Sequence, residues 1–234
     1  MNIEIIPACM PQRFDDIAGV AQSVRHNVRT IQLDLMDGKY VPEPTWPFMY
    51  ETDYLLEDLK KEDNGFPLWE DVNYELDLMV QKPEDNLETW LTIGASRVIF
   101  HYASVANWQP IKNIDPVMRN FVEIGIAITI HDDLEQIYPL IDNQHVDFVQ
   151  VMGIAQIGYM GEPFDEQSLG IIQVLREKYP DMIIAVDGGV SENTIPDLRD
   201  AGATRFVSGS GVFGHGVAGE NVEYLRDIAE GREE

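Results

Sequence analysis

Short apolar runs alternate along the chain with longer segments whose apolar residues recur at helical spacing. Residues 3–8, with the sequence IEIIPA, predict a β-strand, and residues 14–24 predict an amphipathic helix. The same reading predicts further strands at 30–34, 74–80, 97–101, 125–130, 146–152, 183–186 and 205–208. It predicts further helices at 50–61, 115–124, 133–141, 168–178, 194–201 and 221–230, and another helix that begins just after Pro83.

The order of these segments selects an α/β fold class. Apolar strands that alternate with helices indicate a parallel sheet. Eight strand–helix units in 234 residues fit a closed (β/α)₈ TIM barrel, whose usual size is about 250 residues. A doubly wound open sheet is the alternative, but PACMPQRF after the first strand is unlike a glycine-rich dinucleotide loop. Without a Pro-, Gly- or Ser-rich linker, we expect a single barrel domain over residues 1–234, with 57–70 as a surface excursion.

Composition narrows the location and the partners. With 44% hydrophobic residues the chain has the apolar mass of a globular protein, and its apolar runs are too short to span a bilayer. A lone cysteine, Cys9, and the absence of a secretory signal pattern favour a cytoplasmic setting. The formal net charge of −25 argues against nucleic acid or an anionic membrane as a partner. If the substrate is an anion, a local feature of the site must overcome the negative electrostatic potential of the whole protein.

Three carboxylates are predicted at strand ends, where the active sites of such barrels lie: Asp34, Asp77 and Asp187. Carboxylates that converge on a bound substrate can act as a base and an acid, or can hold a divalent cation. The simpler interpretation is that each aspartate starts a turn or caps a helix. That interpretation weakens for three at once, because clustered like charges are costly.

Glycine-rich loops follow the last three strands, in IGYMGEPF, VDGGV and VSGSGVFG. In such barrels the loops after the seventh and eighth strands often bind a phosphate through backbone N–H groups. Amide dipoles would give an acidic protein local positive potential, although the glycines can also serve tight turns alone. Met36, Met79 and Met152 also fall at strand ends, and each by itself is more simply a core residue.

These residues carry a family resemblance. The chain resembles the ribulose-phosphate 3-epimerases and their relatives that epimerise other ketose phosphates. The resemblance covers about residues 3–214, in LDLMDGKYVP, DLMVQKPE, GASRVIFH, VMGIAQIGYMGEPF, AVDGGV and AGATRFVSGSGVF. It implies an isomerase of carbohydrate metabolism on a ribulose-phosphate-binding barrel, acting on ribulose 5-phosphate or a related sugar phosphate, with a homodimer as the expected assembly.

The resemblance also implies roles for residues. Asp34 and Asp187 match the pair that moves protons at C3 through a 2,3-enediolate, with a divalent metal that stabilises it. The expected substrate- and phosphate-binding residues are Met36, Met79, His101, Met152, Gly158, Gly161, Gly188, Gly189, Gly209 and Ser210. For His101, a substrate contact or a satisfied core histidine is favoured over metal ligation.

Two departures from the family fall at positions where the family has metal ligands. Gln32 and Asp77 stand where the family has its two histidine ligands, so the expected metal shell is Gln32, Asp34, Asp77 and Asp187. The cofactor expected is Mg, Mn or Zn, and oxygen donors suit Mg²⁺, Mn²⁺ or Ca²⁺ better than Zn²⁺. Without a metal, repulsion would raise the pKa of one carboxyl, and metal-free proton transfer stays open.

Further departures flank the substrate site. Ala8 replaces a serine, Glu43 an asparagine, Ile157 a proline, Met160 a glycine and Glu162 a glutamine. Three functions therefore remain: a two-aspartate epimerase, a phosphosugar-binding barrel with lost or altered catalysis, or another phosphosugar enzyme. The third is disfavoured because no lysine is expected inside the barrel.

Overall fold

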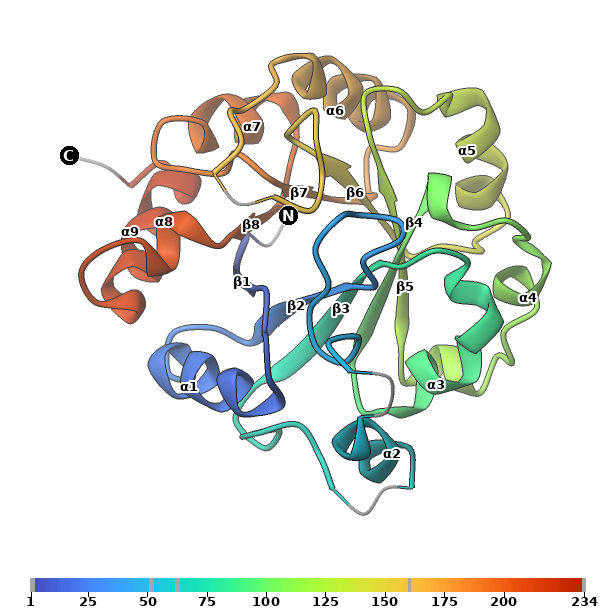
Figure 1. Cartoon of the computed structure of the whole chain (residues 1–234). Helices are drawn as coiled ribbons and strands as arrows, with labels where there is room; N and C mark the ends of the chain where they lie inside the picture. Colours follow the sequence, from blue (N-terminus) through green and yellow to red (C-terminus); the bar gives the residue numbers. More distant parts are fainter. Residues whose placement is uncertain (1–2, 51–52, 62–63, 160, 233–234) are drawn as a thin grey trace.

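Eight parallel strands close into a barrel in the order β1 to β8, and β1 pairs with both β2 and β8. The computed structural model describes all residues except 1–2, 51–52, 62–63, 160 and 233–234. Figure 1 shows the strands ringed by helices. The strands are β1 (Glu4–Cys9), β2 (Thr30–Met36), β3 (Asn73–Met79), β4 (Arg97–His101), β5 (Glu123–Ile128), β6 (Phe148–Met152), β7 (Ile183–Asp187) and β8 (Arg205–Ser208). The predicted (β/α)₈ barrel is confirmed.

Helices follow the strands and cover the outside of the barrel (Figure 1). They are α1 (Phe14–Val24), α2 (Tyr54–Lys60), α3 (Leu87–Thr92), α4 (Gln109–Lys112), α5 (Leu134–Asp142), α6 (Gln167–Lys178), α7 (Ile195–Ala201), α8 (Ser210–Phe213) and α9 (Ala218–Glu230). Three 3₁₀ turns add Pro83–Asn86, Tyr102–Ser104 and Met118–Asn120. No helix in the described part of the chain is long and apolar enough to cross a membrane.

The predicted helix at 115–124 is wrong. Only a 3₁₀ turn, Met118–Asn120, forms there, and β5 already begins at Glu123. Val122 and Ile124 are buried on either side of the exposed Glu123, which is the two-residue alternation of a strand. The short helix α4, which the sequence pattern did not predict, lies just before this segment.

The connection between β2 and β3 contains the predicted excursion at 57–70. The helix predicted from residue 50 begins at Tyr54, and residues 51–52 and 62–63 lie outside the described residues. Phe66 is only 2% exposed and packs against the rings of Phe14, Trp46 and Tyr74. Phe66 therefore anchors this connection to the hydrophobic core.

Apolar side chains form a large core between the strands and the surrounding helices, and a smaller group lies apart from it. The smaller group consists of Ile99, Ala127, Phe148, Met152 and Ala185, which come from neighbouring strands. Alternate residues of each strand point inward, so the barrel is filled by side chains.

Ion pairs close the end of the barrel where the strands begin. The Arg97 guanidinium lies 3.0 Å from carboxylate oxygens of both Glu4 and Glu75, and Arg205 lies 3.2 Å from Glu4 and from Glu123. This network uses up basic residues at the start of the strands. The carboxyl ends of the strands, where the aspartates lie, have no comparable set of described arginines or lysines.

Candidate active site

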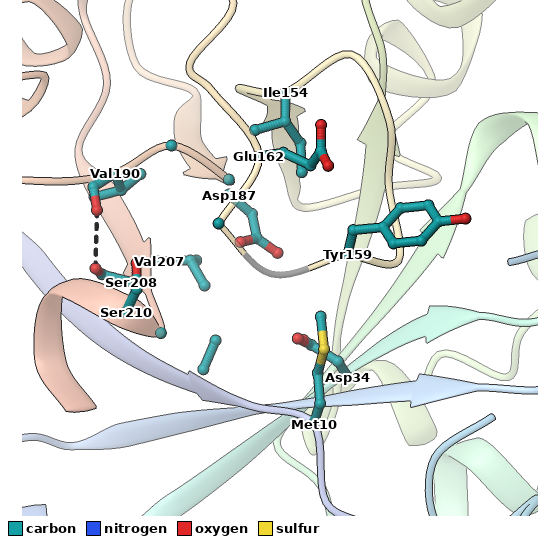
Figure 2. Close-up of a pocket in the computed structure, with 15 residues that line it drawn as sticks. Met10, Asp34, Ile154, Tyr159, Glu162, Asp187, Val190, Val207, Ser208 and Ser210 are labelled. Carbon is teal, nitrogen blue, oxygen red and sulfur yellow. Dashed lines mark hydrogen bonds between the residues drawn. The ribbon is translucent and has the colours of Figure 1, made fainter. Parts of the chain in front are cut away.

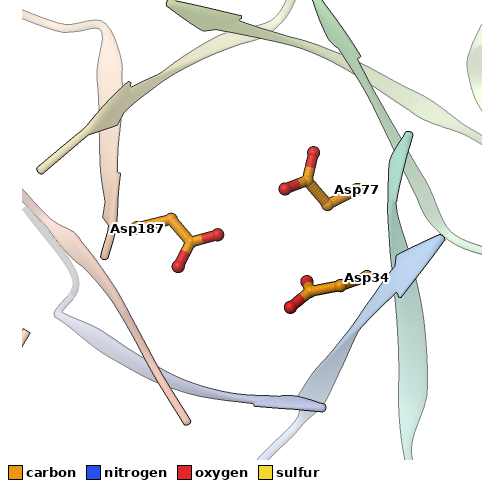
Figure 3. Close-up of side chains that lie close together, drawn as sticks. All are labelled: Asp34, Asp77 and Asp187. Carbon is orange, nitrogen blue, oxygen red and sulfur yellow. The ribbon is translucent and has the colours of Figure 1, made fainter. Parts of the chain in front are cut away.

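Asp34, Asp77 and Asp187 point toward one another from β2, β3 and β7 (Figure 3). One carboxylate oxygen of each lies within 4.8 Å of the others. Parallel pairing places Asp34 directly opposite Asp77, and the closure of the barrel brings Asp187 across to them. The sequence-predicted aspartate triad is thus a real cluster at one end of the barrel.

The Gln32 side chain joins two of the three carboxylates. Its Nε2 group donates hydrogen bonds to Asp34 Oδ1 at 2.9 Å and to Asp187 Oδ2 at 2.8 Å. Its Oε1 atom is buried and has no partner among the described residues. Because Gln32 and Asp34 are two residues apart on β2, both side chains point into the barrel. The amide therefore lies where it can offset repulsion between Asp34 and Asp187.

Asp77 is held separately. His101 Nε2 lies 2.9 Å from Asp77 Oδ1, and Gln150 Nε2 donates to Asp77 Oδ2 at 3.4 Å. His101 is 1% exposed and its Nδ1 atom has no described partner. His101 thus contacts a carboxylate inside the barrel. The expected role of His101 in substrate binding stays a prediction.

Sequence reasoning missed Gln150. It stands in the apolar run VDFVQVM, where a single amide at an inward position of a buried strand was a usable signal. A buried polar group needs a partner, and among the described carboxylates Gln150 contacts Asp77.

Burial and mutual repulsion change the acidity of the triad. Burial, followed by repulsion from Asp187 and Asp77, raises the pKa of Asp34 well above its ordinary value. Burial and repulsion from Asp77 raise the pKa of Asp187 to about 7, although the Gln32 hydrogen bond opposes the shift. Near neutral pH the Asp187 carboxyl can therefore gain or lose a proton.

A cavity of about 80 Å³ opens beside Asp34 and Asp187 (Figure 2). The cavity is lined by Ala8, Met10, Asp34, Ile154, Tyr159, Gly161, Glu162, Asp187, Gly188, Gly189, Val190, Val207, Ser208, Gly209 and Ser210. The structure therefore brings both predicted catalytic residues together with five of the predicted substrate- and phosphate-binding residues. Ala8 and Glu162, which the sequence flagged as departures, line it too.

Two positions in the loop after β7, Gly188 and Gly189, require glycine because of their backbone conformation. Gly188 and Gly189 have φ angles of 90° and 68°, and a Cβ on Gly188 would lie 2.7 Å from Ile154. A Cβ on Gly189 would lie 2.9 Å from the Phe164 backbone. Turn geometry thus explains these glycines, and the same geometry opens the backbone onto the cavity.

Other predicted residues lie outside the cavity lining. Gly158 faces Val41, since a Cβ there would approach the Val41 side chain within 2.6 Å. Met36 and Met79 pack with Val41, and Met152 packs with the interior group around Phe148. Ile157 packs against both of these clusters. These contacts agree with the simpler interpretation that each methionine is a core residue.

The remaining flagged residues stay at the margin. Glu43 is exposed and outside the cavity lining, and Met160 lies outside the described residues. His131 and His215 are exposed. Burial raises the pKa of the Cys9 thiol, which agrees with a packing role rather than a nucleophilic one.

The triad fits a hard divalent cation. It offers three carboxylates, and rotation of the Gln32 amide would add its oxygen, whereas the His101 imidazole is engaged by Asp77. Such donors match Mg²⁺, Mn²⁺ or Ca²⁺ better than the softer Zn²⁺. The acidic triad can therefore hold a metal, and its identity is taken up below.

Known solved structures share the barrel. The KGPDC of Streptococcus mutans superposes with a TM-score of 0.72 at 15% identity, over 97% of each chain. The 3-hexulose-6-phosphate synthase of Salmonella typhimurium superposes with a TM-score of 0.70 at 14% identity, over 99% of this chain and 100% of that one. At these identities the likeness shows the fold alone.

Sequence relatives are more specific. The profile of the ribulose-phosphate 3 epimerase family matches residues 4–213. The cytoplasmic isoform of ribulose-phosphate 3-epimerase from Oryza sativa subsp. japonica is 30% identical over 231 residues, covering 97% of this chain and 95% of its own length. The Schizosaccharomyces pombe ribulose-phosphate 3-epimerase is 29% identical, covering 95% of this chain and 91% of its own length. The chain therefore belongs to the ribulose-phosphate 3 epimerase family, and its sequence-based assignment to the epimerases of carbohydrate phosphates is confirmed at the family level.

Proposed function

We propose that the protein epimerises a ketose phosphate of the ribulose 5-phosphate class at C3, with Asp34 and Asp187 as the proton-transferring pair. One observation carries the proposal. Two carboxyl groups with raised pKa values, on strands from opposite sides of the barrel, border one cavity that also meets the glycine loops. Family membership supplies the reaction class.

The two aspartates suit opposite faces of a substrate. The C3 proton is acidified by the neighbouring C2 carbonyl, so an ionised carboxylate on one face removes it to give a 2,3-enediolate. A protonated carboxyl on the other face then delivers a proton to C3 and inverts the configuration. A pKa of about 7 for Asp187 lets that carboxyl gain or lose a proton near neutral pH.

Gln32 and His101 support this chemistry as positioning residues. The Gln32 amide fixes one oxygen of each catalytic carboxylate, which leaves the other oxygen of each for the substrate. His101 Nε2 and Gln150 Nε2 each contact one carboxylate oxygen of Asp77 and hold that side chain in place. Both arrangements reduce the movement needed before proton transfer.

Asp34, Asp77 and Asp187 would hold a divalent cation, with Mg²⁺ or Mn²⁺ favoured by their oxygen donors. When bound, such a cation supplies Lewis-acid polarisation of the C2 carbonyl and of the enediolate oxygens. The proton itself still passes between C3 and the two aspartate carboxyls.

Backbone groups support phosphate binding in this acidic protein. Gly188, Gly189, Gly209 and Ser210 line the cavity, and the first N–H groups of α8 have no partner within that helix. No lysine, arginine or histidine is among the described lining residues. Recognition of the phosphoryl group is therefore proposed to rest on amide dipoles.

The test is conversion of ribulose 5-phosphate to its C3 epimer, with and without added Mg²⁺, Mn²⁺ or Zn²⁺. We expect Asp34→Asn and Asp187→Asn each to lower kcat by at least about 100-fold, the usual contribution of a general acid or base. Asp200→Asn makes the same charge change on the exposed side of α7 and should leave kcat unchanged.

Two results would count against the proposal. One is parent protein that is inactive under every metal condition yet binds ribulose 5-phosphate, which would favour the binding barrel. The other is full activity in both site variants, which would remove the aspartates from the reaction.

A further inference from the structure

Glu162 places a third carboxylate on the cavity that holds Asp34 and Asp187. It lies on the connection between β6 and α6, and Figure 2 shows it above Asp187 beside Ile154. Its side chain is half-buried. No described residue gives its carboxylate a hydrogen bond or an ion pair.

The same cavity contains the glycine loops proposed to receive the phosphoryl group. A carboxylate without a described neutralising partner therefore lines the same cavity in which a dianion would bind. Like charges in a partly desolvated pocket repel strongly, and no described lining lysine or arginine offsets them. A cation bound to Asp34, Asp77 and Asp187 would instead be attracted, because Glu162 adds negative potential to the site.

We propose that Glu162 is a specificity-determining residue that lowers the affinity of the site for the phosphoryl group and raises its affinity for a divalent cation. The inference rests on the proposed phosphate site and deepens it. It makes a phosphoryl group alone a weak ligand, so that tight binding requires the sugar's own contacts or a cation beside it. One residue thus acts with opposite signs on two ligands.

The two affinities are expected to change in opposite directions, so measuring both separates this inference from a general loss of structure. Binding of inorganic phosphate to the metal-free protein and binding of Mn²⁺ to the phosphate-free protein are each measured by calorimetry. For Glu162→Gln, we expect phosphate affinity to rise about tenfold and Mn²⁺ affinity to fall by about threefold or more, as loss of one nearby charge dictates. Measurements at low ionic strength keep the effect large.

Glu166→Gln is the matched control. Glu166 lies on the same connection, immediately before α6, is exposed and does not line the cavity. Its substitution removes the same charge and should change either affinity by less than about twofold.

Each alternative outcome is distinct. Equal phosphate affinity in the parent and Glu162→Gln would overturn the inference while leaving the phosphate site standing. Equal shifts in Glu166→Gln would overturn it too, by assigning the effect to the general field of the protein. A loss of affinity for both ligands would show that Glu162 only supports the loop. Failure of phosphate to bind any of the three proteins would instead contradict the phosphate site on which this inference rests, whereas conversion of ribulose 5-phosphate tests the proposed reaction separately.

Discussion

At the scale of single residues, the site is organised by how three buried carboxylates avoid one another. Gln32 donates to Asp34 and Asp187, while His101 and Gln150 contact Asp77. These donors compensate only part of the cost, because the pKa values of Asp34 and Asp187 stay raised. The remaining strain can be relieved by a proton or by a cation.

This strain predicts how stability depends on pH. In the folded protein Asp187 keeps its proton up to about pH 7, whereas an unfolded aspartate loses it near pH 4. The folded state therefore binds more protons between these values, and the free energy of unfolding falls as pH rises through this window. Asp34 acts in the same direction.

Thermal unfolding of EDTA-treated protein at several pH values between about 5 and 8 measures this effect. We expect the loss of stability with rising pH to be smaller in Asp187→Asn, and to shrink in the parent when Mg²⁺ is added. A parent slope that neither the substitution nor Mg²⁺ alters would contradict the account of the triad.

Much of this site was predictable residue by residue. Asp34, Asp77 and Asp187 were found because inward positions at strand ends converge once the barrel closes. Gly158 was assigned to the substrate site by motif, yet it faces Val41, because a motif does not say which glycine of a loop lines the cavity. The exposed setting of Glu43 and the lack of a described partner for Glu162 depend on how loops fold over the barrel, which no spacing in the sequence records.

At the scale of elements, the strands were predicted better than the connections. A buried strand has a local signature, whereas residues 115–124 combine a turn with the start of β5 and imitate helical spacing. The connection between β2 and β3 shows the same limit. Its polar composition indicated a surface segment, but Phe66 reaches a cluster of aromatic rings that only tertiary packing assembles.

Phe66 therefore tests the element scale. Phe66→Ala removes a ring that lies 4.8 Å from Tyr74, centroid to centroid, and leaves a cavity in the core. We expect the free energy of unfolding to fall by about 3–5 kcal/mol in urea denaturation. Trp69→Ala, on the same connection but 63% exposed, should change it by about 0.5 kcal/mol or less. Comparable effects of the two substitutions would mean that Phe66 does not anchor the connection.

At the scale of the whole molecule, the net charge of −25 sets the electrostatic setting of the site. Two of the basic residues, Arg97 and Arg205, form ion pairs with glutamates at the opposite end of the barrel and so do not counter the charge near the site. An anionic substrate is thus left to backbone dipoles and to any cation on the triad. The expected homodimer stays a prediction, as does the single-domain interpretation.

The same charge predicts a response to salt. Self-repulsion of an acidic surface weakens the folded state, and ions screen it. Raising NaCl from about 0.02 M to about 0.3 M should increase Tm by roughly 2–4 °C, the shift that about 1 kcal/mol produces in a chain of this size. Sucrose at matched osmolality controls for effects other than screening. A Tm that is constant or falls with salt would show that surface repulsion is not a significant cost.

The central claim is that Asp34 and Asp187 serve opposite faces of C3, and isotope exchange tests it most directly. Ribulose 5-phosphate and its C3 epimer are each incubated in deuterated water with the parent, Asp34→Asn or Asp187→Asn, and deuterium at C3 is measured by NMR. The account predicts that the parent labels both epimers, that each variant labels only one, and that the two variants label different ones. Labelling of the same epimer by both variants, or unchanged labelling of both epimers by either variant, would contradict it.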